Sequence, residues 1–294
     1  FFVWTTKLCR SDWGMVFLAP AKVNLSLRIL GKRADGFHDI ETIMAPLSLA
    51  DTLDIELGEG SGVDFTCSDA SLPRDGTNLV CRAVDAFARH TGRQFHTRIH
   101  LSKNIPHGAG LGGGSSDAAS VIKALDLTLG TGLSISEMES IAASLGSDIP
   151  FFIRSIPSLC RGRGEIVEPL GILPGANILL VKPPFPVPTA WAYQAYKNKT
   201  NRAETFSQWH GSIELMNDLE EPVFSKYLVL PVLKRWLLDH PGVRCAMMSG
   251  SGSTVFAILN EDALDLEDRV LAHFGTSFLA LRCQLLGTRH PDHC

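Results

Sequence analysis

The chain has 294 residues, of which 45% are hydrophobic, and a formal net charge of −4 at pH 7. This length and composition are typical of a globular protein of about two domains, each able to bury a core. Lys and Arg do not outnumber Asp and Glu and are dispersed along the chain, so the composition argues against a nucleic-acid-binding protein.

The cysteines and the N-terminal segment indicate the cellular compartment. The seven cysteines are odd in number, scattered and never arranged as C-x-x-C, which argues against a disulfide framework and a thiolate zinc site. No apolar run approaches the ~18 residues of a membrane span, and Lys7, Arg10 and Asp12 interrupt the start too early for a signal peptide. We expect a cytoplasmic protein with no membrane partner. Met15 precedes the first predicted strand, so residues 1–14 are expected to be an N-terminal extension.

The first hundred residues are predicted to be mostly β-structure. Strict alternation over 22–29 predicts a half-buried strand with Lys22 and Asn24 on its exposed face. Further alternation and helical spacing predict strands over 53–57, 63–65 and 95–101 and a helix over 78–89.

A glycine-rich stretch over 108–114 follows the last of these strands and leads into a predicted helix, which Ser115 or Ser116 is expected to cap. The stretch satisfies G-x-G-x-x-G, but Pro106 intervenes and no acidic residue follows at the spacing of a dinucleotide site. The stretch does not match the P-loop pattern either. Exposed backbone amides before a helix N-terminus are nevertheless typical of phosphate binding, with a ligand-free glycine turn as the alternative.

Beyond this helix, Ser136 and Glu139 are expected to form a capping box for another helix, which ends at Gly146 and leaves Asp148 displayed in the loop beyond. A passage richer in Pro and Gly, 157–188, separates the two halves, and we place the domain boundary near residue 160. The second half is predicted to hold strands over 178–181, 245–248, 255–259 and 279–285 and helices near Trp191, Leu237 and Leu264.

Three ordered segments, 19–25, 106–116 and 248–253, resemble the signature motifs of the GHMP kinases. The resemblance implies an α+β two-domain fold with the active site in the cleft between the domains. Residues 15–160 would form an N-terminal domain similar to the second domain of ribosomal protein S5, and residues 161–294 a ferredoxin-like α/β domain.

Residues 33–38 and 146–150 are similar to the branch of the family that phosphorylates 4-diphosphocytidyl-2-C-methyl-D-erythritol. This similarity implies transfer of the γ-phosphoryl group of ATP to the C2 hydroxyl of that substrate, in the non-mevalonate isoprenoid pathway. Two alternatives stay open: another small-molecule GHMP kinase of the homoserine or mevalonate type, and a non-catalytic nucleotide-binding relative.

The resemblance assigns the catalytic roles to Asp148 and Lys22. Asp148 would act as general base, and Lys22 would keep it ionised and steady the reacting groups through a charged hydrogen bond. Without the resemblance, an Asx turn at Asp148 and a solvated strand lysine would be the simpler interpretations.

The substrate contacts implied by the resemblance are a stacking ring at Phe37, a polar contact at His38 and hydrogen bonds from Asn24. Relatives often place a second aromatic residue where this chain has Leu215, so Leu215 is the expected apolar substitute.

ATP and Mg²⁺ are the implied cofactors, with Mg²⁺ near Ser115 or Ser116 and no protein metal site of its own. Residues 250–252 would back the phosphate loop, or simply form a glycine hairpin. A metal site in the tail 290–294 is disfavoured, and the chain is expected to be a monomer or homodimer. The ATP-binding residues implied are Asn78, Lys103, Pro106, His107, Gly108, Ala109, Gly110, Leu111, Gly112, Gly113, Gly114, Ser115 and Ser116.

Overall fold

The computed structural model describes residues 14–196, 208–260, 263 and 265–287. Its strands are β1 (Met15–Lys32), β2 (His38–Gly58), β3 (Gly62–Cys67), β4 (His96–Ser102), β5 (Ser158–Gly162), β6 (Ile166–Pro169), β7 (Ala176–Lys182), β8 (Gln208–His210), β9 (Ile213–Asn217), β10 (Val243–Met248), β11 (Val255–Leu259) and β12 (Leu279–Leu285). Its helices are α1 (Leu79–Thr91), α2 (Gly113–Leu129), α3 (Ile135–Leu145), α4 (Ile149–Arg154), α5 (Thr189–Ala195), α6 (Glu220–Lys226), α7 (Val229–Leu238) and α8 (Leu266–Phe274).

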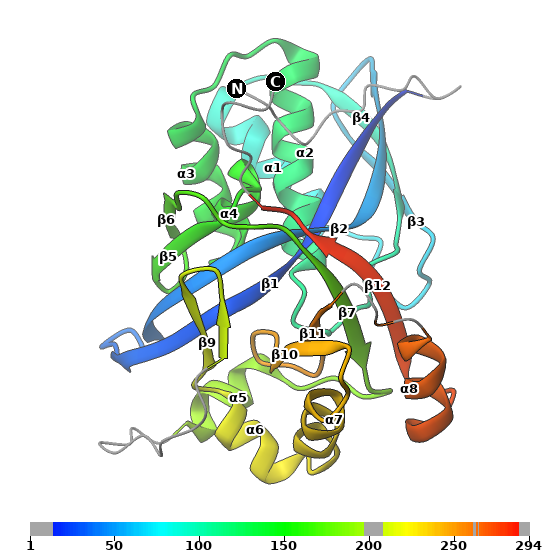
Figure 1. The fold of residues 1–294 in the computed structure, drawn as a ribbon. Helices are drawn as coiled ribbons and strands as arrows, with labels where there is room; N and C mark the ends of the chain where they lie inside the picture. The colour runs from blue at the N-terminus through cyan, green and yellow to red at the C-terminus, as the bar shows by residue number, and fades with distance from the viewer. Residues whose placement is uncertain (1–13, 197–207, 261–262, 264, 288–294) are drawn as a thin grey trace.

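A long antiparallel hairpin of β1 and β2 crosses the middle of the molecule (Figure 1). The strand order is β10-β11-β7-β12-β2-β1-β9-β8, with β3 to β6 attached through β2. Helices α1 to α4 lie on one side of the hairpin and α5 to α8 on the other (Figure 1). The mixed α+β architecture expected from the sequence is confirmed.

Three buried clusters hold these layers together. In the first, the apolar faces of α1, α2 and α4 pack on β2 and β4, with Phe87 and Phe151 fully buried. In the second, α6 and α7 cover β7, β10 and β11 through Val223 and Leu233. The third joins β1 to the C-terminal strands, with Leu25 among its residues. Burying all three sets away from water is the main force that fixes the two helical layers against one sheet.

The strand predicted over 22–29 is longer than expected, and its predicted exposed face is wrong. Every residue from 19 to 27 is buried, and the exposed fractions of Lys22 and Asn24 are 4% and 2%. β1 lies between β2 and β9 in the sheet, and α2 packs against it. An alternating sequence therefore lies here in a doubly covered strand, with its polar residues bonded to one another.

The capping box of α3 lies two residues before its expected position. Ser134 Oγ accepts a hydrogen bond from the Glu137 amide at 3.2 Å, and the Glu137 carboxylate accepts one from the Ser134 amide at 2.8 Å. The predicted partner Glu139 instead pairs with Arg154, whose Nε lies 2.6 Å from its Oε1. Glu139 is thus occupied by a tertiary ion pair, and Ser134 with Glu137 forms the capping box in place of Ser136 with Glu139.

The passage 157–188 holds β5, β6 and β7, and β5 pairs with β2 from Ile40–Gly162 to Met44–Ser158. The expected division between 160 and 161 falls within β5, and the exact boundary stays a prediction. Almost all of the expected extension 1–14, Leu264 and the tail 290–294 lie outside the described residues.

Two expectations from the composition, on membrane spans and on disulfides, can be compared with the structure. Over the described ranges, no helix has both the length and the apolar character needed to cross a membrane. The cysteines of these ranges are free and buried: Cys67, Cys81, Cys160, Cys245 and Cys283.

Candidate active site

One cavity of about 650 Å³ brings together most of the residues singled out from the sequence. Its walls come from both halves of the chain, because β1 and the glycine-rich loop meet Thr189 and Ser251 there. A site in the cleft between the halves is what the resemblance implied. Of the expected site residues, those that line it are Lys22, Asn24, Phe37, His38, Lys103, Pro106, His107, Gly108, Ala109, Gly110, Leu111, Gly112, Gly113, Gly114, Ser115 and Asp148.

The loop before α2 takes a backbone path that requires glycine. Gly110 has φ 75°, and a side chain there would collide with the carbonyl oxygen of Ser249. Gly112 has φ 73°, and a Cβ there would lie 2.7 Å from Phe152 Cζ. Residues other than glycine rarely adopt such φ values, and here none would fit. The glycines thus allow the loop to pass between α4 and the hairpin that follows β10.

The start of α2 differs from the prediction. Gly112 is the N-cap in a left-handed conformation, so neither Ser115 nor Ser116 caps the helix. No side chain caps this end, and a helix leaves its first N–H groups unpaired, so the first turn of α2 can bind an anion. Ser115 lines the cavity, whereas Ser116 is fully buried and its Oγ has no hydrogen-bond partner among the described residues.

The second glycine segment, 250–252, is both a hairpin and a support. It connects the antiparallel strands β10 and β11, and Gly250 and Ser251 line the cavity. Ser249 Oγ donates a hydrogen bond of 3.0 Å to the Gly110 carbonyl oxygen. The segment is therefore a glycine hairpin, and it also supports the glycine-rich loop.

Lys22 and Asp148 face each other across the cavity wall, with 3.6 Å between Nζ and Oδ2. Lys22 Nζ also donates a 2.6 Å hydrogen bond to Asn24 Oδ1, and Asn24 Nδ2 donates one of 2.8 Å to Thr42 Oγ1. Thr42 Oγ1 in turn donates to the Ser26 carbonyl at 2.6 Å. This buried chain fixes the position of the ammonium group.

Asp148 stands at the N-cap position of α4 without forming a side-chain cap, and its side chain is 36% exposed. The Asx-turn alternative, in which the carboxylate binds local backbone, is therefore not the arrangement at this N-cap. Its carboxylate is open to the cavity beside the lysine. This arrangement allows it to accept a proton from a bound alcohol.

Aromatic and basic side chains form the cavity wall near the turn between β1 and β2. Phe37 is 53% exposed, and the guanidinium carbon of Arg163 lies 5.2 Å from its ring centroid. His38 stacks on Tyr193 with 5.4 Å between the ring centroids. Burial lowers the pKa of His38 and raises that of Tyr193, which keeps both rings uncharged near neutrality. Arg163 is not among the site residues expected from the sequence.

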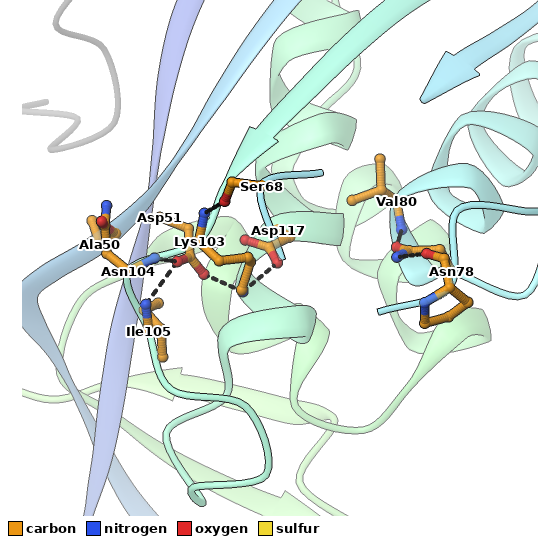
Figure 2. A network of polar contacts seen from close by, with 10 residues as sticks. Ala50, Asp51, Ser68, Asn78, Val80, Lys103, Asn104, Ile105 and Asp117 are labelled. Carbon is orange, nitrogen blue, oxygen red and sulfur yellow. Dashed lines mark hydrogen bonds and ion pairs between the residues drawn. The ribbon is translucent and has the colours of Figure 1, made fainter. Parts of the chain in front are cut away.

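Besides Ser116, two of the expected contacts lie outside the cavity. Leu215 is 6% exposed and packs in the core beneath β9. Asn78 caps α1, since its Oδ1 accepts from the Val80 amide at 2.9 Å and its Nδ2 donates to the Pro73 carbonyl at 2.8 Å (Figure 2). Both residues thus have complete structural roles.

Lys103 lines the cavity but is already paired. Its ammonium group forms ion pairs with Asp51 and Asp117, two residues that sequence reasoning did not identify (Figure 2). They come from β2 and α2, far apart in the sequence, so no local spacing could have revealed them. Within the described ranges, no three His, Cys, Asp or Glu side chains are grouped to hold a metal ion.

Comparisons with known proteins agree with this geometry. The GHMP kinases N terminal domain model matches residues 78–155, and the GHMP kinases C terminal model matches residues 199–276. The 4-diphosphocytidyl-2-C-methyl-D-erythritol kinase of Methylacidiphilum infernorum (isolate V4) is 45% identical over 247 residues, which cover 83% of this chain and 86% of the relative.

Solved structures give the same result. A crystal structure of 4-(cytidine 5'-diphospho)-2C-methyl-D-erythritol kinase is 33% identical with a TM-score of 0.76, covering 93% of this chain and all of the other. A homoserine kinase from Cytophaga hutchinsonii has a TM-score of 0.65 at 17% identity, covering 96% of this chain and 97% of its own. The second likeness concerns the fold alone. The expected two-domain fold is confirmed.

Proposed function

The chain belongs to the GHMP kinase family and, within it, to the 4-diphosphocytidyl-2-C-methyl-D-erythritol kinases, and from this premise we propose that it transfers the γ-phosphoryl group of ATP to the C2 hydroxyl of that substrate. The observation that carries the proposal is the single cavity in which the glycine-rich loop, the Lys22–Asp148 pair and the Phe37–His38 segment meet. Phosphoryl transfer to an alcohol needs a phosphate cradle, a proton acceptor and an acceptor site in one place.

Asp148 is proposed as the general base. The substrate oxygen forms a bond to the γ-phosphorus while the bond from that phosphorus to the bridging oxygen breaks, and ADP leaves with its electron pair. The hydroxyl proton passes to the Asp148 carboxylate. Lys22 orients this carboxylate from 3.6 Å and offsets the negative charge that develops on the reacting oxygens. Asn24, whose side-chain amide already bonds Lys22 and Thr42, is assigned the role of holding Lys22.

The glycine-rich loop and the start of α2 are proposed to bind the triphosphate. Backbone N–H groups and the positive end of the helix dipole attract phosphate oxygens. The absence of side chains at Gly110 and Gly112 lets the loop pass close to Ser249 and Phe152 without a clash. Lys103 lines this site, and no direct contact with ATP is proposed for it.

Mg²⁺ is proposed to be held by the ATP phosphates together with Ser115, because of the two serines Ser115 lines the cavity and Ser116 is fully buried. A hydroxyl oxygen fits a hard cation that prefers oxygen ligands. When bound, the ion neutralises phosphate charge.

The cytidine end of the substrate is proposed to bind at the turn between β1 and β2. Phe37 offers an exposed ring for one face of the base, and Tyr193 takes the role expected of Leu215, because Leu215 lies in the core. His38 is placed to bond the polar edge of the base. Arg163, which lines the cavity and whose Nε lies 3.6 Å from Glu165 Oε1, is proposed to supply a cation for the diphosphate.

The test is ADP release by the purified chain with MgATP and each of three acceptors: the cytidine-linked methylerythritol, homoserine and mevalonate. We expect turnover with the first alone, and ³¹P NMR should locate the new phosphate on C2. Turnover with homoserine or mevalonate instead would indicate another GHMP reaction, and ATP binding without turnover would indicate a non-catalytic relative. A cytoplasmic location and a monomeric or dimeric state remain predictions.

A further inference from the structure

A buried cluster of three ionisable side chains lies beside the glycine-rich loop. Lys103 stands between Asp51 and Asp117, and its Nζ lies 2.9 Å from Asp117 Oδ2 (Figure 2). The exposed fractions of the three side chains are 8% for Lys103, none for Asp51 and 3% for Asp117. Charges removed from water to this degree are stable only when they are paired and hydrogen-bonded.

Asp51 anchors the segment that leads into the loop. The β2–β4 ladder ends at the pair Thr52–Ser102, after which the chain leaves the sheet. Asp51 Oδ1 accepts hydrogen bonds from the amides of Asn104 at 2.6 Å and Ile105 at 2.8 Å. One side chain thus takes the place of the missing strand partner. The path of the chain into Pro106 is set by this carboxylate.

Asp117 anchors the other end of the loop. It lies in the second turn of α2, and Lys103 Nζ also approaches the helix start, within 3.2 Å of the position of a Cβ on Gly113. Lys103 therefore connects the end of β4 to the helix that the loop feeds. Residues 104–112 are held at both ends by one cluster.

The cluster has two carboxylates for one ammonium group. Burial raises the pKa of Asp117 to about 8, with Lys103 opposing the shift and Asp51 adding to it. Asp117 is therefore the carboxyl group of this cluster that retains a proton near neutral pH. Ionisation of Asp117 at higher pH would add one negative charge below the start of α2.

We propose that Asp51 and Asp117 are positioning residues for ATP: through Lys103 they clamp both ends of the glycine-rich loop in the shape that binds the triphosphate. This inference rests on the proposed role of the loop in binding ATP. Neither carboxylate touches the nucleotide in this account. A negative charge on Asp117 lies close enough to the loop to oppose a bound triphosphate.

The experiment compares wild type, Asp51→Asn and Asp117→Asn, with Asp85→Asn on the exposed side of α1 as the matched control. Affinity for the Mg²⁺ complex of adenylyl imidodiphosphate is measured by calorimetry between pH 7 and 9.5, and KM and kcat with both substrates at pH 7.5. Melting temperatures show whether each variant is folded.

Asp51→Asn should weaken analogue binding about tenfold or more and raise KM for ATP far more than KM for the acceptor, because the start of the loop loses its ion pair with Lys103. Wild-type affinity should fall several-fold from pH 7 to 9.5, whereas Asp117→Asn should lose this decline and Asp85→Asn should keep it. If Asp51→Asn does not fold, the pH comparison with Asp117→Asn still tests the clamp.

Two results would overturn the inference: a folded Asp51→Asn that binds the analogue as wild type does, or parallel pH curves for wild type and Asp117→Asn. Either result, obtained with a wild type that phosphorylates the cytidine substrate, leaves the proposed function intact. A wild type that does not bind the analogue at all would overturn the proposed function first.

Discussion

Lys22 Nζ lies 3.6 Å from Asp148 Oδ2, although the two residues are 126 positions apart, on β1 and at the start of α4. Lys22 is 4% exposed while the Asp148 side chain is 36% exposed. The buried partner is thus held rigidly, and the exposed partner faces the cavity. This asymmetry suits a fixed cation that orients a carboxylate which must contact the substrate.

Asp148→Asn should lower kcat by about a hundredfold or more and leave affinity for ATP within about threefold of wild type. The amide keeps the shape of the side chain but cannot take the hydroxyl proton. Steady-state kinetics and calorimetry with an ATP analogue measure the two quantities. Asp85→Asn, on the exposed face of α1, is the control. Unchanged turnover would remove Asp148 from the mechanism.

Phe37→Ala should raise KM for the cytidine substrate about fivefold, because a stacked aromatic contact contributes about 1 kcal/mol. The ring is 53% exposed, so little packing is lost and the melting temperature should hardly change. Ile166→Ala is a closely matched control, since Ile166 is also 53% exposed but does not line the cavity. An effect confined to KM for ATP would contradict the assignment of this wall to the cytidine.

Gly110→Ala should weaken ATP binding by about tenfold or more and also destabilise the fold. The added methyl group meets the Ser249 carbonyl in a backbone region, φ 75°, that alanine rarely adopts. Gly130→Ala separates the two causes, because Gly130 has φ 58° but no heavy atom within 4 Å of an added Cβ. Kinetics and thermal unfolding of both variants provide the measurement. Equal KM values for ATP would show that the close approach to Ser249 is unimportant.

The glycine-rich loop could be found from the sequence because its signal is local, a run of glycines before a helix, whereas the role of Asp148 came from the family resemblance. The burial of Lys22 could not be predicted, because an alternating sequence does not distinguish a half-exposed strand from a strand covered on both faces. Tyr193 and the Asp51–Lys103–Asp117 cluster depend on contacts between distant elements. Only the folded chain brings such residues together.

Leu215 illustrates the same limit for an inference drawn from a family pattern. Its position in the sequence suggested a replacement for an aromatic ring, but β9 pairs with β1 and turns the side chain into the core. Asn217, two positions later, makes the structural contacts of this strand end. Asn217 Nδ2 donates hydrogen bonds of 2.8 Å to the carbonyls of Met248 and Gly250 and holds the hairpin that supports the loop.

Lys123, on α2, provides a prediction on stability and pH. Its Nζ donates a 2.9 Å hydrogen bond to the Phe152 carbonyl near the end of α4, and burial lowers the pKa of Lys123 to about 7. The unfolded chain, where the pKa is near 10.5, then binds more protons than the native protein between pH 7 and 10.5. The free energy of unfolding should therefore rise with pH across this window.

Lys123→Met should remove this contribution. The stability of wild type relative to the variant should increase from pH 7 to pH 9 by at most about 1.4 kcal/mol for each pH unit. Below pH 7 the difference should become constant, because the amine is then protonated in both states. Urea unfolding of the two proteins at several pH values measures the difference. Parallel stability curves from pH 7 to 9 would mean that Lys123 is charged in the native protein and that its amine is solvated beside α4.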